Sequence, residues 1–361
     1  MTFPVTRHDI DAAAQRISGS VRLTPVIEVD VPTPDGPRAV VLKLELLQHT
    51  GSFKPRGAFN RVLSATVLDA GLIAASGGNH GLAVAHVAHE LGLRAEIFVP
   101  DSTPSTKLDR LRAFGTGVDV VVGGALYADA QEASTARAAV TGALVVHPYD
   151  QPEVVAGQGT MAREIDDQVP DADVVLVAVG GGGLIAGAAC WFADRARIFA
   201  VEPATSRAMG AALEAGQPVD VDVSGVAADS LGARRVGELA FAAAQAASVA
   251  HLAVDDDDIR AAQRWAWNAL RLVVEPGGAT ALAAVMSGSW TAADGDRVVV
   301  VVCGATTDPS LVSCAELSEA RPERPVAEGD ESGRERDVRS SQRTSDPRGQ
   351  TGRTTTTRGN R

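Results

Sequence analysis

Residues 173–190 read DVVLVAVGGGGLIAGAAC, and this stretch decides the fold. Its first part, VVLVAV, is apolar at every position, which is typical of a strand that is buried on both faces of a parallel sheet. Four consecutive glycines follow, Gly180, Gly181, Gly182 and Gly183, and then an alanine-rich run with the apolar spacing of a helix. A strand that passes through a short loop into a helix predicts an α/β protein.

Strands and helices of the same kind alternate on both sides of this stretch. We predict strands within residues 40–46, 72–76, 95–100, 118–124, 144–149, 173–180, 197–203 and 297–304. We predict helices within residues 80–92, 106–115, 184–196 and 257–273, where apolar residues recur with helical spacing. Buried strands separated by helices indicate open, twisted parallel sheets that are covered on two sides.

The bulk composition predicts a soluble cytoplasmic protein. A chain of 361 residues with 45% hydrophobic content can bury a sizeable core in one large or two medium domains. Its three cysteines, Cys190, Cys303 and Cys314, are too scattered for a disulfide framework, which favours a reducing compartment. The N-terminus lacks an apolar signal core, and no apolar run reaches the roughly 18 residues of a membrane span.

Residues 318–361 differ in composition from the rest of the chain. They contain ten arginines and eight acidic residues, but only four apolar side chains. Such a segment buries too little apolar surface to offset the entropy of ordering, so we predict a disordered polar tail. Its arginines alternate with acids and lack aromatic neighbours, and the net charge of the whole chain is −12. These features argue against a nucleic-acid partner.

The four glycines are a candidate phosphate site. Consecutive glycines let backbone N–H groups converge, and the helix that follows adds the positive end of its dipole. The spacing matches neither the dinucleotide motif GxGxxG nor a P-loop, because Ile185 interrupts the first and no Lys-Ser/Thr pair follows. A tight structural turn is the alternative interpretation of the same residues.

A single lysine stands in turn-forming sequence at residues 48–60, which read QHTGSFKPRGAFN. Lys54 follows Phe53 and lies between Gly51 and Gly57. A buried lysine can form a Schiff base with a carbonyl, and a phosphorylated aldehyde held by a glycine loop is pyridoxal 5′-phosphate. A structural lysine that reaches solvent from a loop is the alternative.

Several long motifs occur together in one order along the chain. The sequence resembles the fold-type II pyridoxal-phosphate enzymes, specifically the serine/threonine dehydratase (threonine ammonia-lyase) branch that also contains serine racemase. The motifs that carry this resemblance are LTPV (23–26), KLELLQHTGSFKPRGAFN (43–60), ASGGNHGLAVA (75–85), GGGGLIAG (180–187), AVEP (200–203), VVEPGGA (273–279) and VVCGATTD (301–308).

The resemblance implies the domain organisation and the setting of the protein. The fold would be the two-domain, tryptophan synthase β-like one. Residues 1–70 plus 149–317 would form a large cofactor-binding domain, and residues 71–148 a small inserted domain. The protein would be a cytoplasmic homodimer that acts on a small amino acid, without a nucleic-acid or membrane partner.

The resemblance also implies how the cofactor is held. Lys54 would carry the Schiff base and take the α-proton of the substrate, and Phe53 would pack against one face of the ring. Asn79 would donate a hydrogen bond to the phenolic oxygen, and residues 180–183 would hold the phosphate. Glu275 would lie near the ring. Cys303 would lie beside the pyridine nitrogen and leave it unprotonated.

These residue types also have simpler explanations when each is taken alone. Phe53 is compatible with the plain core, Cys303 with the end of a buried strand, and Glu275 with the start of the following helix. Ser76, Asn79 and His80 would surround the substrate carboxylate, where a helix N-terminus favours an anion. His80 is also compatible with a polar residue that binds no ligand.

Three positions depart from the family pattern. Gly77 stands where serine racemase has the serine that serves as its second acid, so we predict elimination and not racemisation. Ala208 stands where metal-binding members have an aspartate six residues after Glu202, so we predict no bound divalent cation. Thr306 replaces a frequent asparagine, and the sequence offers no account of that exchange.

The predicted activity is a β-elimination. L-Threonine or L-serine would lose water and ammonia to give 2-oxobutyrate or pyruvate. The alternatives are a 3-hydroxyaspartate dehydratase or another lyase of the same branch, a serine racemase, and a non-catalytic protein of the same fold that binds a partner.

Overall fold

Two β-sheets organise residues 3–310, the part of the chain that this computed structural model describes. Cys314 and the predicted tail at 318–361 lie outside the described residues. The larger sheet has the strand order β1-β2-β10-β7-β8-β9, and the smaller has the order β5-β4-β3-β6. The strands are β1 (Val26–Val31), β2 (Arg38–Lys43), β3 (Leu72–Ala75), β4 (Ala95–Val99), β5 (Val118–Val122), β6 (Leu144–Val145), β7 (Val174–Ala178), β8 (Arg197–Pro203), β9 (Ala250–Val254) and β10 (Val298–Val301).

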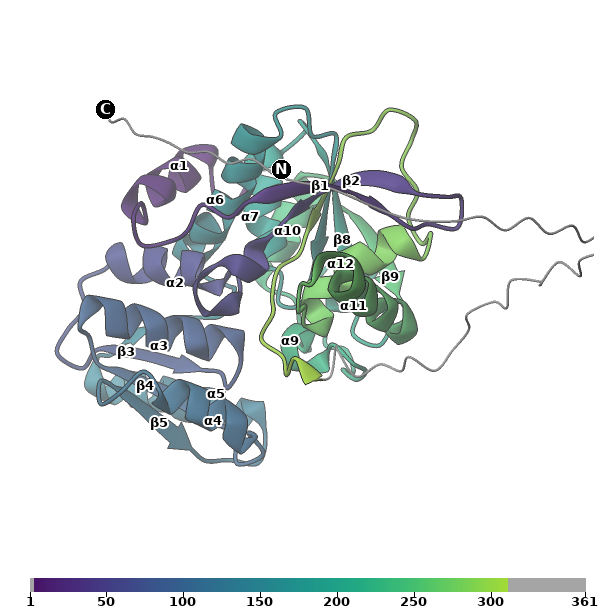
Figure 1. The fold of residues 1–361 in the computed structure, drawn as a ribbon. Coiled ribbons are helices and arrows are strands. Elements are labelled where there is room, and N and C mark those ends of the chain that lie inside the picture. Colours follow the sequence, from purple (N-terminus) through teal and green to yellow (C-terminus); the bar gives the residue numbers. More distant parts are fainter. Residues whose placement is uncertain (1–2, 311–361) are drawn as a thin grey trace, which may run out of the picture. The chain divides into compact units, whose positions relative to one another are not determined.

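Helices surround both sheets (Figure 1). Two 3₁₀ turns, η1 (Glu45–Leu47) and η2 (His49–Gly51), precede the second α-helix. The α-helices are α1 (Arg7–Arg16), α2 (Lys54–Leu63), α3 (Asn79–Leu91), α4 (Ser105–Arg112), α5 (Tyr127–Thr141), α6 (Pro152–Gln168), α7 (Gly183–Phe192), α8 (Ala208–Ala215), α9 (Ala228–Leu231), α10 (Glu238–Ala246), α11 (Asp256–Leu270) and α12 (Pro276–Met286).

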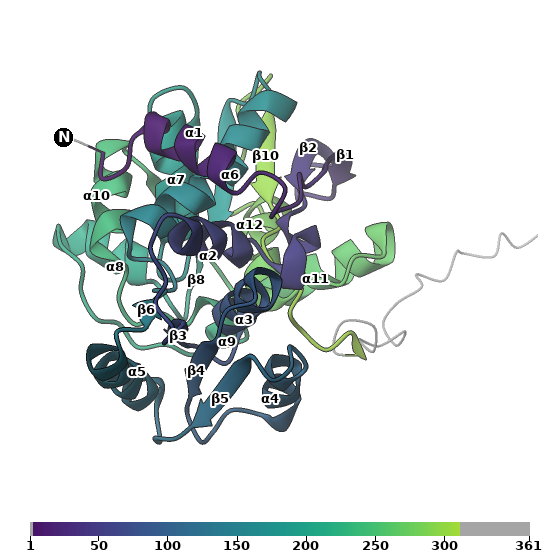
Figure 2. The same ribbon diagram turned by 90° about the vertical axis from the view of Figure 1, so that its left-hand side faces the viewer.

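The smaller sheet is parallel and is covered on both faces, as predicted. Side chains alternate between the faces of a strand. In β3, Leu72 and Ala74 therefore join one hydrophobic cluster with residues of α3 and α4. Ile73 and Ala75 join a second cluster with Ala130 of α5. Figure 2 shows α5 on the opposite side of these strands from α3 and α4.

The larger sheet is parallel from β2 to β9. All residues of β7 and β10 are buried, which explains why these strands read as continuous apolar runs. Helices α6, α7 and α10 lie on one side of the sheet and α11 and α12 on the other (Figures 1 and 2). The edge strand β1, which was not predicted, pairs with β2 in the antiparallel sense. β1 is only partly buried, which an antiparallel edge strand tolerates.

The register of the larger sheet brings three loops to one edge. Val299 of β10 pairs with Val41 of β2 and with Val175 of β7, and all three strands run in the same direction. The segments that follow them therefore leave the sheet at the same edge. A bridge between Ser52 and Gly304 ties two of these segments together. No helix in the described part of the chain is long and apolar enough to cross a membrane.

Candidate active site

Lys54 is the first residue of α2, a helix that starts with proline at its second position. Phe53 precedes it and donates its backbone N–H to the carbonyl oxygen of Cys303 at 3.3 Å. The Lys54 Nζ donates to the carbonyl oxygen of Pro148 at 2.8 Å and lies 4.9 Å from the centroid of the Phe53 ring. Burial lowers the pKa of Lys54 to about 8, and the negative charge of Glu275 acts in the opposite direction. Lys54 therefore holds a neutral amine far more readily than an exposed lysine does.

The chain has only three lysines, and their environments differ. The Lys43 Nζ is buried and donates to Glu164, Gln168 and the Thr24 carbonyl. Lys107 is paired with Asp229. Lys54 has a backbone carbonyl as its hydrogen-bond partner and no carboxylate partner among the described residues. Of the three lysines, Lys54 is thus the one whose amine is free for covalent chemistry.

Asn79 and Glu275 meet beside the end of β10. Asn79 is the first residue of α3, and its Nδ2 donates to Glu275 Oε1 at 2.7 Å. The Asn79 Oδ1 is buried and has no hydrogen-bond partner among the described residues. Glu275 is 4% exposed and precedes α12. Burial raises the pKa of Glu275 to about 7 despite the hydrogen bond from Asn79. The carboxyl group therefore changes charge near neutral pH.

Thr306, for which the sequence offered no account, forms hydrogen bonds with Glu275 and with Thr50, which lies four residues before Lys54. Its backbone N–H donates to Glu275 Oε2 at 3.2 Å. Its hydroxyl donates to the carbonyl oxygen of Thr50 at 3.4 Å, where Thr50 adopts the left-handed conformation with φ of 61°. Gly304 leaves room for the carboxylate, because a Cβ atom there would lie 2.0 Å from Glu275 Oε1.

Cys303 is buried and carries a neutral thiol. Its Sγ donates to the carbonyl oxygen of Gly277 at 3.6 Å. Burial raises the pKa of the thiol far above its ordinary value, and the negative charge of Glu275 acts in the same direction. Cys303 is therefore a weak neutral donor at this site and not a thiolate.

The glycine loop presents unused backbone donors. Gly182 caps α7 with φ of 93°, and Gly183 is the first residue of the helix. The amides of Gly180, Gly181, Gly182 and Gly183 donate to no other residue within 3–310. Adjacent N–H groups at a helix N-terminus form a ready anion site. A Cβ atom on Gly181 would lie 2.1 Å from Cδ1 of Tyr149, so the loop needs glycine there.

Tyr149 connects the glycine loop to Lys54. It directly follows Pro148, whose carbonyl oxygen accepts from the Lys54 Nζ. The sequence analysis named neither residue. Both follow β6, so the rule that sites lie at the carboxyl ends of parallel strands could have indicated them.

Ser76 and His80 flank the start of α3, and both side chains already have hydrogen-bond partners. Ser76 Oγ accepts from the Gly78 N–H at 3.2 Å. His80 Nε2 lies 2.7 Å from the carbonyl oxygen of Val146, and the imidazole is buried. Burial lowers the pKa of His80 to about 3, so the ring is neutral. The binding of a carboxylate by Ser76, Asn79 and His80 stays a prediction.

Gly77 lies close to Thr103, a residue that the sequence analysis did not name. A Cβ atom on Gly77 would lie 3.0 Å from Cγ2 of Thr103. This contact is tight but not prohibitive, because the neighbouring atom belongs to a side chain.

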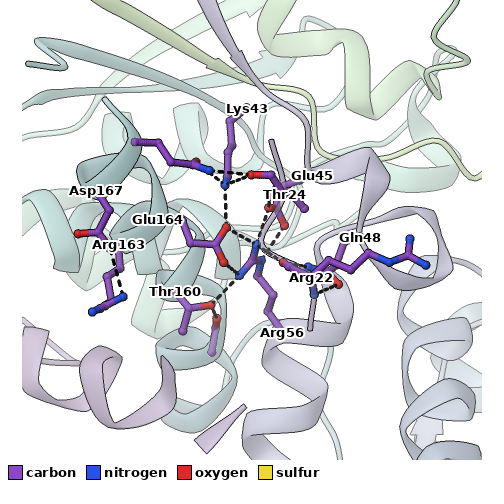
Figure 3. Close-up of polar contacts among 12 residues, drawn as sticks. Arg22, Thr24, Lys43, Glu45, Gln48, Arg56, Thr160, Arg163, Glu164 and Asp167 are labelled. Atoms are coloured by element: carbon purple, nitrogen blue, oxygen red, sulfur yellow. Dashed lines mark hydrogen bonds and ion pairs between the residues drawn. The ribbon is translucent and has the colours of Figure 1, made fainter. Parts of the chain in front are cut away.

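A buried network of charges holds α2 in place (Figure 3). Arg56, on the first turn of α2, donates to both carboxylate oxygens of Glu45 at 2.8 Å. It also donates to both oxygens of Glu164 on α6, at 2.7 and 2.8 Å. Lys43 donates to the same Glu164 at 2.7 Å. Two cations thus meet two carboxylates, and the network joins β2, η1 and α6 to the helix that begins with Lys54.

Glu202, the one residue that matches the metal loop of metal-binding family members, contacts protein groups. Its carboxylate accepts the backbone N–H groups of Met209 and Gly210 at 2.8 and 2.9 Å, at the start of α8. His251 Nε2 lies 2.9 Å from the same carboxylate. Arg207 bonds to Glu214 instead. Within residues 3–310 no group of three or more His, Cys, Asp or Glu side chains is placed to hold a metal ion.

Comparisons with known proteins agree with this arrangement. Residues 17–304 match the family described as pyridoxal-phosphate dependent enzyme. The biosynthetic L-threonine dehydratase IlvA of Mycobacterium leprae is 37% identical over 316 residues, which cover 85% of this chain and 74% of that protein. The L-threonine ammonia-lyase of Thermotoga maritima is 32% identical over 313 residues, which cover 85% and 77%.

Solved structures show the same fold. Maize serine racemase is similar with a TM-score of 0.79 at 27% identity, over 86% of this chain and 96% of that one. The processed form of threonine deaminase isoform 2 from Solanum lycopersicum has a TM-score of 0.76 at 30% identity, over 85% and 92%. The chain therefore belongs to the pyridoxal-phosphate dependent enzymes. Its relatives include proteins named threonine dehydratase, and its structural neighbours include a serine racemase, which confirms the predicted fold class and family.

The residues of the site fit pyridoxal 5′-phosphate. The unused amides of residues 180–183 suit a phosphate. The Lys54 amine suits an aldehyde, and the unpartnered amide oxygen of Asn79 marks a buried position where a polar partner is missing.

Proposed function

We propose that this protein is a pyridoxal-phosphate dependent ammonia-lyase that converts L-threonine, L-serine or both to 2-oxobutyrate or pyruvate and ammonia. The observation that carries the proposal is Lys54. Its amine has a lowered pKa, lacks a carboxylate partner in the described part of the chain, and bonds to Pro148 next to Tyr149, the residue that contacts the glycine loop. The relatives named as threonine dehydratase and threonine ammonia-lyase support the choice of reaction.

In the proposed mechanism the protein first positions the substrate and the phosphate. Amides of residues 180–183 hold the phosphate, and the start of α3 with Ser76 and Asn79 faces the substrate carboxylate. The neutral His80 ring stays on Val146, where it fixes the start of α3 against the segment that contains Pro148. The bound cofactor supplies an electron sink for the electron pair that the α-carbon releases.

Lys54 then moves the proton. Its amine, with a pKa of about 8, takes the proton from the α-carbon, and the Pro148 carbonyl oxygen holds the resulting ammonium. The β-hydroxyl takes up a proton, which balances the proton that Lys54 removes from the α-carbon, and leaves as water. Hydrolysis of the dehydrated product then gives the 2-oxo acid and ammonia. The neutral Cys303 thiol supplies no positive charge to the pyridine nitrogen, a weak polarisation that suffices when a leaving group departs.

The position of Gly77 favours elimination over racemisation. Inversion needs an acid on the face of the α-carbon opposite the base, and glycine has no side chain to deliver a proton. The side chain nearest to a Cβ atom placed on Gly77 is Thr103, whose closest atom is a methyl carbon. The protein therefore has one base at this carbon.

The test is an assay of 2-oxo acid formation from L-serine, L-threonine and threo-3-hydroxyaspartate, together with chiral analysis of the remaining amino acid. We expect 2-oxo acid from threonine or serine and no D-enantiomer. The variant Lys54→Ala should lose at least about 100-fold in kcat, and Lys54→Arg, which keeps the charge, should lose as much. A preference for 3-hydroxyaspartate would favour the alternative lyase, and formation of D-serine as the main product would refute the proposal.

We further propose that the enzyme works in the cytoplasm as a homodimer, on a small amino acid and without nucleic acid. Cys190 and Cys303 are buried and free, which suits a reducing compartment. Light scattering of the purified protein should give about twice the 37.2 kDa mass of one chain. A mass of one chain at micromolar concentration would contradict the dimer.

A further inference from the structure

Among the described residues, the side-chain amide of Asn79 has a hydrogen-bond partner at its nitrogen and none at its oxygen. Its Nδ2 donates to Glu275 Oε1 at 2.7 Å, and its buried Oδ1 has no partner within 3–310. A half-turn of the amide exchanges the two ends without moving the backbone. In that orientation Oδ1 faces Glu275, and Nδ2 takes the place of the oxygen that lacks a partner. Two oxygen acceptors can share one hydrogen bond only if a proton lies between them.

The phenolic oxygen of the cofactor is a hydrogen-bond acceptor that carries negative charge. An ionised Glu275 competes with it for the Asn79 Nδ2 and adds a second negative charge at a buried position, where Glu275 is 4% exposed. A protonated Glu275 instead donates to Asn79 Oδ1 and leaves both N–H groups of Nδ2 for the cofactor. The Thr306 N–H continues to donate to Glu275 Oε2 in either state.

We propose that Glu275 is a positioning residue, which takes up a proton when the cofactor binds and thereby turns the Asn79 amide so that Nδ2 donates to the phenolic oxygen. This inference rests on the assignment of the cofactor site made above. It gives Glu275 a defined role and explains why a carboxyl group is buried against an amide.

The groups around Glu275 are consistent with uptake of a proton near neutral pH. Glu275 stands at the start of α12. The ionisable groups that face it are Lys54 of α2, Lys107 of α4, Asp229 of α9 and Cys303 after β10. Burial is the largest influence and raises the pKa of Glu275 to about 7, and the negative charge of Asp229 acts in the same direction. Hydrogen bonds from Asn79 and Thr306 and the charge of Lys107 oppose this shift.

The proton count on cofactor binding tests the proposal without an activity assay. Titration calorimetry of the full chain with pyridoxal 5′-phosphate at pH 8, in buffers of different ionisation enthalpy, gives the number of protons taken up. Near one unit above its pKa, Glu275 is about 90% ionised before binding, so the wild type should take up about 0.9 proton more than Glu275→Gln. The Gln side chain imitates the protonated carboxyl, because its amide N–H can donate to Asn79 Oδ1.

The pH dependence of cofactor affinity is the second measurement. Above about pH 7, the dissociation constant of the wild type should rise about tenfold per pH unit relative to that of Glu275→Gln. The negative charge of Glu275 raises the pKa of Lys54, so Glu275→Gln also lowers that pKa. Above about pH 8 the Lys54 amine is mostly neutral in both proteins, so the ratio isolates Glu275 in that range. Asp229→Asn serves as the control variant, because removing this negative neighbour lowers the pKa of Glu275. The ratio of the dissociation constant of Asp229→Asn to that of Glu275→Gln should then begin to rise at a lower pH than the corresponding wild-type ratio.

The outcomes separate this inference from the proposed function. A wild type that gains no visible absorbance with pyridoxal 5′-phosphate overturns both. A wild type that binds the cofactor with the same proton uptake as Glu275→Gln, and with a ratio of dissociation constants that is flat in pH, overturns the role of Glu275 alone. If Glu275→Gln does not fold by circular dichroism, the dissociation constants of Asp229→Asn and the wild type are compared directly, and a ratio of these two constants that does not change with pH overturns the role instead.

Discussion

Replacement of Arg56 by methionine tests how much the buried charge network contributes to the structure that holds Lys54. Arg56 and Glu45 are fully buried, and Glu164 is 14% exposed at its side chain. In Arg56→Met, Lys43 remains hydrogen-bonded to Glu164, but the Glu45 carboxylate keeps only the hydroxyl of Thr24, at 2.5 Å, as a hydrogen-bond partner among residues 3–310 and feels the charge of Lys43 without a bond to it. Removing one partner of a buried ion pair typically costs about 3–5 kcal/mol, because a charge stays buried without compensation.

The size of the effect can be measured by thermal unfolding of the protein without cofactor. An unfolding entropy of about 2.1 cal/mol/K per residue gives residues 3–310 about 0.65 kcal/mol/K, so the expected loss corresponds to a Tm about 5–8 °C lower. Arg163→Met on α6 is the control. Arg163 pairs with Asp11 at 2.8 Å, but both side chains are more than one third exposed, so its loss should cost less than about 1 kcal/mol.

The pH dependence of this difference follows from Glu45. Burial alone would raise the pKa of Glu45, but the charges of Arg56 and Lys43 outweigh it and hold the pKa below its ordinary value. The wild type thus gains stability from Glu45 above the unfolded pKa of about 4.5 and loses it as the pH falls through the lower folded pKa. In Arg56→Met the pKa should rise, so the stability difference should shrink as the pH falls below neutral and Glu45 becomes neutral. A difference below about 1 kcal/mol at pH 7, or one that grows on acidification, would refute this reasoning.

Three further predictions concern the site itself. Gly77→Ser should form D-serine in an amount that chiral chromatography can measure. The double variant Gly77→Ser with Thr103→Ser should form more, because it removes the Thr103 methyl group that would lie 3.0 Å from the new Cβ atom. Efficient racemisation by the wild type would contradict the reasoning on Gly77. Stopped-flow absorbance can follow the rate at which the protein binds pyridoxal 5′-phosphate. This rate should rise with pH as the Lys54 ammonium loses its proton, and it should level off above about pH 8. A rate that falls across pH 7–8 would contradict the role of the Lys54 amine. Gly181→Ala should weaken cofactor binding at least about tenfold, since its Cβ atom would lie 2.1 Å from the Tyr149 ring. Adding Tyr149→Ala should recover part of the lost affinity. An unchanged dissociation constant in Gly181→Ala would exclude this contact as the reason for the glycine.

The strands of the core could be predicted because strands that are buried on both faces consist almost entirely of apolar residues. Runs such as VVLVAV in β7 are apolar at every position, and all of β7 is buried. By contrast, β1 and β9 were missed. Both are short, partly buried strands. In β1 apolar and polar side chains alternate from Ile27 to Val31, and in β9 (AHLAV) a histidine leaves only three consecutive apolar residues, so no long apolar run marks either strand. The direction of β1 depends on its pairing with β2, which local sequence does not encode.

From the sequence we could predict candidate site residues, whose roles toward the cofactor stay predictions, but not the contacts among them. Motif positions brought Phe53, Lys54, Asn79, Glu275 and Cys303 onto the list, and the structure gathers these around the ends of β10 and the start of α3.

Contacts between segments that are far apart in the chain could not be predicted from the sequence. Glu164 lies 108 residues from Arg56, and Glu275 lies 196 residues from Asn79. The partner of the His80 ring, the Val146 carbonyl oxygen, is a backbone atom that no motif marks. Thr306 was unexplained for the same reason, because its contact with Glu275 is made by its backbone N–H.

Borohydride reduction tests whether Lys54 carries the cofactor, since it fixes a Schiff base as a stable amine. The protein is mixed with pyridoxal 5′-phosphate, reduced, digested with trypsin and analysed by mass spectrometry. Because Pro55 follows Lys54 and blocks cleavage there, the account predicts one labelled peptide, residues 44–56, with the added pyridoxyl mass on Lys54. A label on Lys43 or Lys107, or no stable label at a cofactor concentration that saturates the visible absorbance, would contradict it.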